Sequence, residues 1–410
     1  MTATLDGPWL DQPRTDAHSH TAPATGAPGQ HDVTWDTARQ LAHAAAPLSP
    51  RRVPLAEAAG ATLAGPLLAL RCSPAFDASA MDGYAVAGLP PWHQVGRLEA
   101  GQAWPAPLAA GTAVEIATGA PLPVGARGVL RYEDAAVVNG LVTGDPGRAS
   151  HVRATGSDVR TGQEILPAGA ALTPAALGLA AAAGHDDLLV RPRPRVYVIV
   201  TGRELTGHGP GGGAAVRDAL TPLLVPLIGR LGGEVAGVAR TDDDGLPAHW
   251  EQDRHGADVV VTTGSTSRGM TDRLPALARS AGIVFHGVRC RPGHPQLLAG
   301  GAAGPWLVGL PGNPFAAFTA AWTTLAPLFA GLTGRPLSVL PRICLAGEQP
   351  GPRPGTTRLV PVRWTDDGPC LLAGASSAFL GNAARQHALA VFGPNWRPGD
   401  PCRLLLTDIP

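Results

Sequence analysis

The chain has 410 residues, which is enough for two to four domains of ordinary size. Apolar residues make up 44% of the sequence, so buried cores are expected and disorder of the whole chain is excluded. Basic and acidic residues balance at 32 each, which argues against a protein that binds nucleic acid through its net charge. Any anionic ligand would therefore need a local site.

The cysteines and the apolar stretches indicate the compartment. The five cysteines are widely spaced and form no CxxC motif, so neither a zinc site nor a disulfide framework is expected. The first residues contain no basic stretch followed by an apolar core, so no signal peptide is expected. The most apolar stretch, residues 165–183, is rich in alanine and contains two prolines, which is typical of a soluble helix. We expect a cytoplasmic protein with no membrane and no nucleic-acid partner.

The N-terminal segment has the composition of a disordered tail. Residues 1–30 are rich in Pro, Thr, Ala and Gly and show no periodicity. His18, His20 and His31 suggest a metal site, but no carboxylate or cysteine set accompanies them. Solvated histidines are therefore the favoured interpretation.

Residues 31–192 are predicted to form an N-terminal linker and β-rich domains, discontinuous in sequence. A helix is expected at 34–46, ended by Pro47. Short apolar runs broken by glycine and proline predict β-structure over 50–150. A second helix is expected between the N-cap Thr173 and Gly184.

The pattern changes to alternating strands and helices over residues 193–336. We expect strands at 195–200, 234–239, 258–263, 283–288 and 306–310, with helices at 220–231, 246–255, 272–281 and 314–325. This alternation predicts a parallel sheet with helices on both faces. Residues 337–410 return to short strand-like runs and predict a small C-terminal β-domain. The fold class is therefore α/β with additional β-rich domains.

The loops that follow the predicted strands are small, polar and glycine-bearing. They are residues 201–204, 242–244, 262–269, 291–295 and 311–314. Ligands bind beyond the carboxyl ends of parallel strands, and glycine together with helix N-termini allows backbone N–H groups to approach an anion. Plain turns between strands and helices are the alternative. The sequence thus predicts an anion-binding edge of this sheet.

Three carboxylates, Glu204, Asp243 and Asp272, fall on the same edge. Acids around an anion site are compatible with a divalent cation between them, because Mg²⁺ bridges carboxylate and phosphate oxygens. Each acid alone is equally well explained as a helix cap or a solvated charge. Separately, residues 73–86 combine Ser79, Asp82 and small residues in an otherwise apolar stretch, which is typical of an ordered functional loop.

Several of these segments resemble the molybdopterin molybdenumtransferase family, of the MoeA type shared with the E domain of gephyrin. The loop Ser79-Ala-Met-Asp-Gly-Tyr-Ala85 resembles the family signature. The similarity continues in order through residues 117–123, 156–159, 201–205, 263–269, 291–295 and 310–314. It covers the chain from about Asp32 to the C-terminus.

The resemblance implies a four-part homodimer with a central MogA-like α/β domain and a barrel-like C-terminal β-domain. Its cleft would lie between the α/β domain of one subunit and the loop-bearing domain of the other. The implied reaction inserts molybdate into adenylylated molybdopterin with Mg²⁺ and releases AMP. Other cofactor-biosynthesis proteins would be partners.

The resemblance also implies residue roles. The catalytic group would be Asp82, Thr118, Asp158, Glu204, Asp243 and Asp272, of which Glu204, Asp243 and Asp272 would hold the metal. The substrate-binding group would be Ser79, Gly264, Ser267, Pro292, Gly293, His294, Pro311, Gly312 and Asn313.

The sequence departs from the family pattern at a few loop positions. Arg203 stands where an aspartate is usual before the glutamate, and His294 replaces a lysine. The other departures are Ser265, Arg268, Met270, Pro275 and Leu220. Two alternatives therefore stay open: a non-catalytic homologue that binds molybdopterin, molybdate or a partner, and a related molybdopterin adenylyltransferase.

Overall fold

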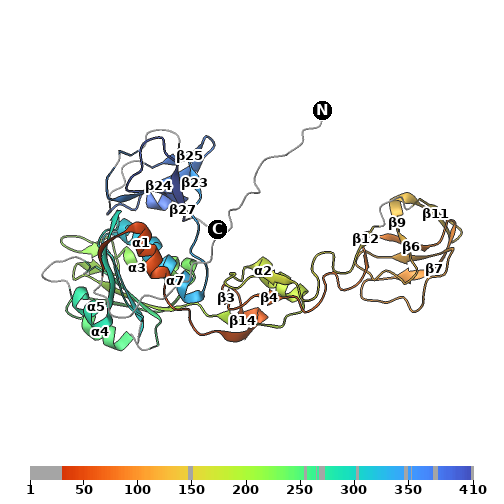
Figure 1. Cartoon of the computed structure of the whole chain (residues 1–410), viewed down its shortest axis with the longest axis horizontal. Helices are drawn as coiled ribbons and strands as arrows, with labels where there is room; N and C mark the ends of the chain where they lie inside the picture. The colour runs from red at the N-terminus through yellow and green to blue at the C-terminus, as the bar shows by residue number, and fades with distance from the viewer. Residues whose placement is uncertain are drawn as a thin grey trace.

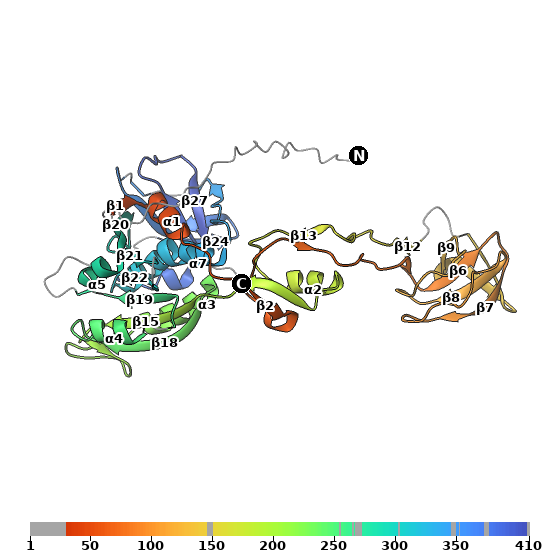
Figure 2. The same ribbon diagram turned by 60° about the horizontal axis from the view of Figure 1, so that its bottom comes forward.

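The computed structural model describes residues 30–145, 151–253, 256–264, 266, 273–301, 304–345, 350–351, 353–372 and 377–407. The predicted tail, except for Gln30, lies outside these residues. The described chain forms three parts along its long axis: an α/β part joined to the C-terminal strands, a middle part with α2, and a distal β part (Figures 1 and 2). The middle part separates the other two.

The α/β part is built on one mixed sheet. Its strands lie in the order β18 (Glu234–Thr241), β15 (Arg195–Thr201), β19 (Val259–Thr263), β22 (Trp306–Leu310), β21 (Leu297–Gly300) and β20 (Ile283–Arg291). The first four are parallel, whereas β21 is antiparallel to both of its neighbours. The expectation of a purely parallel sheet is wrong at β21, because a four-residue run without alternation carries no strand signal of its own.

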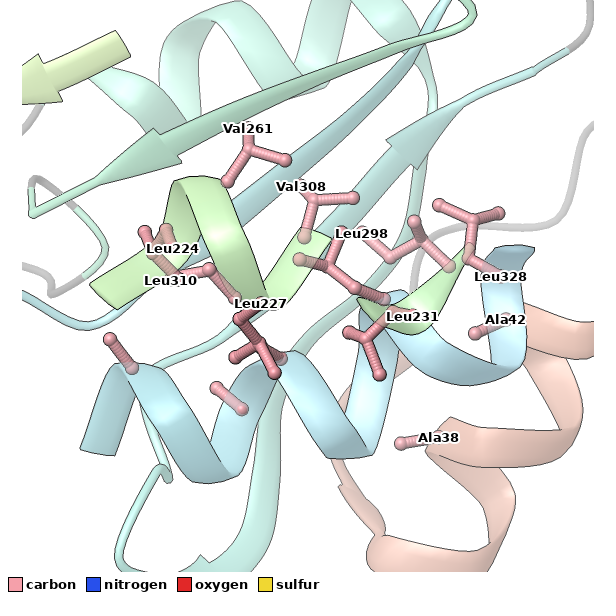
Figure 3. Close-up of a cluster of buried hydrophobic side chains, with 14 of the residues drawn as sticks. Ala38, Ala42, Leu224, Leu227, Leu231, Val261, Leu298, Val308, Leu310 and Leu328 are labelled. Carbon is pink, nitrogen blue, oxygen red and sulfur yellow. The ribbon is translucent and has the colours of Figure 1, made fainter. Parts of the chain in front are cut away.

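Helices cover both faces of this sheet, as predicted. Along β15, the side chains of Val196, Val198 and Val200 enter one core, whereas Ile199 enters the other. The first core contains α3 (Leu220–Leu231), and the second contains α4 (Leu246–Asp253) and α5 (Leu274–Ala281). Figure 3 shows leucines of α3 against the sheet, with Ala38 and Ala42 nearby. Alternate side chains of a strand face opposite sides, so a continuous apolar run serves two cores.

The helix after β22 is longer than the sequence predicts. It runs through α6 (Pro314–Ala320), a π-helical segment η3 (Ala321–Leu325) and α7 (Ala326–Thr333). By length and composition this stretch could cross a membrane, but 83% of its most apolar window is buried inside the protein. It therefore has the environment of a core helix.

The first described residues pack on the α/β part. β1 (Gln30–Thr34) pairs in parallel with β20, and α1 (Trp35–His43) follows it. The hydroxyl of Thr34 accepts a hydrogen bond from the backbone N–H of Thr37 at 3.1 Å and caps the helix. The side chain of Trp35 is fully buried in the α/β core. This segment thus belongs to the α/β core, although the sequence groups it with the N-terminal linker.

The middle part is a small β-structure with one helix. β14 (Asp187–Arg191) lies between β2 (Arg51–Pro54) and β3 (Thr62–Leu63), and β4 (Leu67–Leu68) pairs with β13 (Glu164–Leu166). α2 (Pro174–Ala182) begins after Thr173, whose hydroxyl accepts from the N–H of Ala176. Gly184 follows the helix at φ +96°. The predicted cap and stop are confirmed.

The distal part is a six-stranded sheet. One segment of the chain enters it and another leaves it. Its order is β10 (Ala135–Val138), β11 (Leu141–Gly144), β7 (Trp92–Leu98), β8 (Thr112–Ile116), β6 (Gly83–Ala87) and β9 (Gly128–Arg131). A short pair, β5 (Ala78–Ser79) with β12 (Val152–Arg153), stands at its entrance. The β-structure predicted for residues 50–150 is confirmed.

The C-terminal strands form an antiparallel sheet. They are β24 (Thr357–Thr365), β25 (Gly368–Leu371), β26 (Ala388–Phe392), β27 (Cys402–Leu406) and β23 (Arg342–Ile343). β24 also pairs with the end of β20 at Cys290 and Arg291, so both sheets are continuous. This junction places the C-terminal part beside the edge that carries the loops predicted to bind ligand.

Candidate functional site

The carboxyl ends of β15, β19 and β22 meet at one edge of the α/β sheet. The hydroxyl of Thr201 donates to the carbonyl of Thr263 at 2.6 Å, and the N–H of Gly264 donates to the carbonyl of Leu310 at 3.0 Å. Gly264 has φ +76°, and a Cβ there would lie 2.8 Å from the Thr201 hydroxyl. A Cβ on Gly312 would lie 3.7 Å from the Gly264 Cα, so the two predicted cradle glycines are neighbours.

The start of α6 faces this edge and is shared with the C-terminal part. Asn313 and the preceding Pro311 connect β22 to the helix. The side-chain amide of Asn313 donates to the hydroxyl of Ser377 at 3.3 Å, and the N–H of Ala316 donates to the Ser377 carbonyl. Ser377 is a neighbour of the site that the sequence analysis missed, because it lies more than sixty residues further along the chain.

The loop containing Pro292, Gly293 and His294 is fixed by a buried glutamine. The amide of Gln296 donates to the carbonyl of Gly293 at 2.6 Å, and its oxygen accepts from the Thr324 hydroxyl at 2.6 Å. Gly293 has φ +100°, a backbone conformation that favours glycine. The π-helical turn of η3 therefore carries a residue that supports the predicted loop. Neither Gln296 nor Thr324 was predicted.

A polar cavity of about 400 Å³ opens beside this loop. Its lining residues are Asp32, Thr266, His286, Gly287, Arg291, His294 and Pro295. The His294 ring lies 3.1 Å from the carboxylate of Asp32, and the buried ring of His286 donates to the carbonyl of Thr266 at 3.0 Å. β1 brings Asp32 to this cavity, which the sequence could not indicate because the pairing of β1 with β20 is long-range.

Two of the predicted acids, Glu204 and Asp243, lie near arginine side chains at the ends of β15 and β18. Glu204 is exposed and follows β15, whereas Asp243 is partly buried and follows β18. Arg203 lies between the two acids that flank Asp243. Its guanidinium binds Asp242 at 3.2 Å through Nε and Asp244 at 2.6 Å through Nη2. Asp244 also binds Arg273 at 3.0 Å.

The Asp242 carboxylate is held in its ionised form. Its Oδ1 accepts a hydrogen bond from the backbone N–H of Gly245 at 2.9 Å. This bond lowers the pKa of Asp242, and the charge and hydrogen bond of Arg203 lower it further against the opposing effect of burial. The acidic turn is thus satisfied by backbone and arginine donors.

Two of the three predicted metal ligands, Glu204 and Asp243, lie within the described residues. Within the described ranges, no three His, Cys, Asp or Glu side chains come close enough to hold a metal ion. The two acids that flank Asp243 in the chain, Asp242 and Asp244, are bound by Arg203. Asp272, the third predicted ligand, lies outside the described residues, as do Ser265, Ser267, Arg268 and Met270. The predicted Mg²⁺ site at this edge therefore stays a prediction.

A buried aspartate that the sequence analysis missed supports the Glu204 loop. Asp218 accepts hydrogen bonds from the N–H groups of Leu220 and Thr221, from the Thr221 hydroxyl, and from Arg240 at 2.7 Å. Burial raises the pKa of Asp218, but the bonds from Thr221 and Arg240 outweigh it, and the pKa is lowered. An acid two residues before a predicted helix is a capping signal that could have revealed it.

Short backbone pairings connect this cap to Glu204. β16 (Leu205–Thr206) pairs with β17 (Val216–Arg217), and the N–H of Val216 donates to the Glu204 carbonyl at 2.7 Å. The N–H of Asp218 donates to the carbonyl of Thr206. The start of α3 therefore positions the Glu204 loop.

In the distal part, Asp82 and Thr118 are brought together as predicted. The Asp82 carboxylate accepts from the N–H of Thr118 at 2.7 Å and from its hydroxyl at 3.1 Å. Both side chains are exposed. Gly83 is required next to them, because a Cβ there would lie 2.1 Å from the Leu130 carbonyl across the β6–β9 pair.

Ser79 lies inside the same loop rather than on its surface. Its side chain is fully buried, and its hydroxyl donates to the carbonyl of Met81 at 2.5 Å. This geometry shapes the turn before Asp82 and argues against the substrate contact predicted for Ser79.

Asp158 is exposed on a neighbouring loop. Its N–H donates to the carbonyl of Ser73, and the bridge between Ser73 and Val159 holds the two segments together. Asp77, which was not predicted, accepts from the N–H and hydroxyl of Thr155 at 2.7 and 2.8 Å. These two bonds lower the pKa of Asp77. They fasten the Asp158 loop to the segment that leads to Asp82.

A pair of tyrosines supports the Asp82 loop from behind. The Tyr132 hydroxyl donates to Glu115 at 2.7 Å, and its ring packs edge-on against Tyr84 at 5.4 Å between centroids. Burial, followed by the hydrogen bond and charge of Glu115, raises the pKa of Tyr132 to about 12. The N–H of Tyr132 donates to the Asp82 carbonyl at 3.4 Å.

One chain does not bring the two halves of the predicted site together. Asp82 directly precedes β6 and Thr118 follows β8, both in the distal part, whereas Glu204 and the glycine cradle lie in the α/β part. Figures 1 and 2 both show the middle part between them. A complete site therefore requires a second molecule or a large rearrangement.

Comparisons with known proteins agree with this architecture. Residues 33–184 match the family model described as "MoeA N-terminal region (domain I and II)", and residues 197–331 match "Probable molybdopterin binding domain". The chain is 35% identical over 309 residues to a Mycobacterium tuberculosis protein named molybdopterin molybdenumtransferase 2, covering 70% of this chain and 76% of that protein. It is 35% identical over 308 residues to the Synechococcus elongatus molybdopterin molybdenumtransferase, covering 69% and 75%.

Solved structures show the same fold. Two crystal structures of a molybdopterin biosynthesis moeA protein from Pyrococcus horikoshii match over 92% of this chain and 100% of theirs. Their TM-scores are 0.74 and 0.70, at 22% and 25% sequence identity. The arrangement of parts seen in Figure 1 is thus that of a known multidomain fold.

Proposed function

The chain belongs to the molybdopterin molybdenumtransferase family, a family of transferases in molybdenum cofactor biosynthesis, and we propose that it inserts molybdenum into adenylylated molybdopterin. In this proposal, molybdate is the second substrate and AMP is released. The observation that carries it is the adjacency of Gly264 and Gly312 at the strand ends of the domain matched as molybdopterin-binding. Backbone without side chains lets a pterin or phosphate approach closely.

The α/β edge would hold the substrate. Gly264, Pro311, Gly312 and Asn313 would line one side, and Pro292, Gly293 and His294 would line the other. The 400 Å³ cavity beside His294 and Arg291 supports this placement.

The second half of the site would come from another copy of the chain. The distal part, whose neighbouring loops bear Asp82, Thr118 and Asp158, is far from the α/β edge within one chain (Figure 2). A homodimer in which this loop reaches the edge of the partner would complete the site. In that assembly Asp82, oriented by Thr118, would accept hydrogen bonds or a proton at the reacting phosphate.

A requirement for Mg²⁺ is expected from the family resemblance alone. Glu204, Asp243 and Asp272 would be the ligands, but the described residues do not gather three such groups. We also propose that the protein is cytoplasmic and that it interacts with other cofactor-biosynthesis proteins.

A direct assay tests the reaction. Purified protein is mixed with adenylylated molybdopterin and molybdate, with Mg²⁺ or with EDTA, and AMP release and active cofactor are measured. We expect AMP to appear only when molybdate is present. Tight binding of the substrate without AMP release would instead identify a non-catalytic homologue, and consumption of ATP with metal-free molybdopterin would identify an adenylyltransferase.

Mixing two inactive variants tests the shared site. Asp82→Asn alters the distal half, and Glu204→Gln alters the α/β half. Each variant alone should be inactive, whereas the refolded or exchanged mixture should recover about one quarter of the wild-type sites, because mixed dimers carry one intact site. No recovery from a mixture shown to contain mixed dimers would refute a site built from two chains.

A further inference from the structure

Arg203 connects the ends of two neighbouring strands through charge. It follows β15, and the two acids that it binds follow β18, the strand paired with β15 in parallel. One guanidinium reaches both carboxylates, Asp242 through Nε at 3.2 Å and Asp244 through Nη2 at 2.6 Å. Arg273, just before α5, binds the other oxygen of Asp244 at 3.0 Å. Arginine thus sits where three successive carboxylates would otherwise repel one another.

These contacts compete with a metal ion for the same ligands. Three ionised acids on one turn need a counter-charge, which either a divalent cation or a basic side chain can supply. Here both carboxylates that flank Asp243 are already bound to a guanidinium. A cation entering the turn would have to displace Arg203, whose charge is permanent.

Arg203 also retains donors for a ligand. A guanidinium has five N–H groups, and the two bonds to Asp242 and Asp244 use two of them. The side chain is 72% exposed, so the remaining donors are accessible. They stand at the same sheet edge as the Gly264 cradle, and arginine binds phosphate oxygens in a planar, two-point manner.

We propose that Arg203 is a built-in cation of this acidic edge, which binds the phosphate of the substrate in place of a divalent metal ion. The inference rests on the proposed function for the identity of the phosphate-bearing ligand. It goes beyond that function in assigning a specificity role to a residue outside the predicted catalytic set. Binding of a phosphate-bearing ligand should therefore depend little on Mg²⁺.

The test compares wild-type protein with Arg203→Asp and Arg203→Gln. AMP is titrated calorimetrically into each full-length protein, in EDTA and in Mg²⁺. The wild-type affinity should change less than about twofold between the buffers, whereas Arg203→Asp should lose about tenfold in EDTA and recover in Mg²⁺. Arg203→Gln, which adds no acid, should lose affinity in both buffers.

Metal binding is measured separately by the electron paramagnetic resonance signal of free Mn²⁺. Arg203→Asp frees the Asp242 and Asp244 oxygens that Arg203 binds and adds another carboxylate, so it should bind Mn²⁺ at least about tenfold more tightly than the wild type. Arg273→Gln is the matched control, since Arg273 binds Asp244 but does not bridge the turn to β15. It should change Mn²⁺ affinity much less than Arg203→Asp.

The outcomes distinguish the role proposed for Arg203 from the proposed function of the protein. Wild-type protein that binds Mn²⁺ as tightly as Arg203→Asp, or that loses AMP affinity tenfold in EDTA, would overturn the inference. If AMP binds without metal but adenylylated molybdopterin yields no AMP, the inference stands and the proposed function fails. If AMP binds wild-type protein in neither buffer, the phosphate role of Arg203 and the proposed product site both fail.

Discussion

Substitution of Gly264 by alanine tests the construction of the glycine cradle. Gly264 has φ +76°, where an L-residue pays a steric penalty of about 1–2 kcal/mol. The new Cβ would lie 2.8 Å from the Thr201 hydroxyl, which must then move. That hydroxyl donates to the Thr263 carbonyl at 2.6 Å, and a broken buried hydrogen bond costs about 1 kcal/mol. We expect Gly264→Ala to destabilise the sheet by about 2–3 kcal/mol in total.

A double mutant separates the two contributions. Thr201→Ala removes the clash together with the hydrogen bond, so it should cost about 1 kcal/mol alone. Because the bond can be lost only once, Gly264→Ala with Thr201→Ala should be about 1 kcal/mol less destabilising than the sum of the single variants. Gly256→Ala is the control for backbone strain, since Gly256 has φ +84° but its nearest neighbour to a new Cβ is 3.8 Å away.

Hydrogen exchange of β15 and β19 measures the effect, because it reports the free energy of local opening at these strands. Substrate binding should weaken in parallel. Full additivity of the two substitutions, or a cost for Gly264→Ala equal to that for Gly256→Ala, would refute the contact with Thr201.

Three further predictions concern groups whose pKa is shifted. At neutral pH, Asp218→Asn should lower the free energy of opening of the first α3 amides by about 1–3 kcal/mol, because an ionised cap is lost. Since the folded-state pKa of Asp218 is lowered, its contribution is present above the ordinary aspartate pKa and is lost as the pH falls through the folded-state pKa. Equal exchange of these amides in both proteins at pH 7 would contradict this prediction. The ultraviolet titration of Tyr132, assigned by Tyr132→Phe, should show a pKa near 12, and a midpoint near 10 would mean that the Glu115 contact is absent. Cys290, fully buried with its pKa raised to about 12, should resist a thiol reagent while exposed Cys344 reacts; equal reaction rates would show that the β20 end opens freely.

Much of the local structure could be read from the sequence. Thr173 caps a helix as expected, and the apolar run of β15 forms a strand buried on both faces. Thr34, expected as the first residue of a helix, is the N-cap of α1. The adjacency of Gly264 and Gly312 also follows from sequence, because the carboxyl ends of parallel strands must lie at one edge. Caps, periodicity and strand direction are determined by neighbouring residues, so they are visible without the tertiary structure.

Other features depend on contacts between distant residues. The sequence could not show that β21 runs antiparallel or that β1 brings Asp32 to the His294 cavity, because strand pairing is long-range. It placed Arg203 beside the acids, but only the tertiary structure joined its guanidinium to both Asp242 and Asp244. The resemblance implied that Asp82 and Glu204 meet only between two subunits, and the tertiary structure shows the middle part of the chain between them within one chain (Figure 1). The sequence alone predicted which residues form each half of the site, whereas the packing of distant segments decided where the halves lie and which charges they meet.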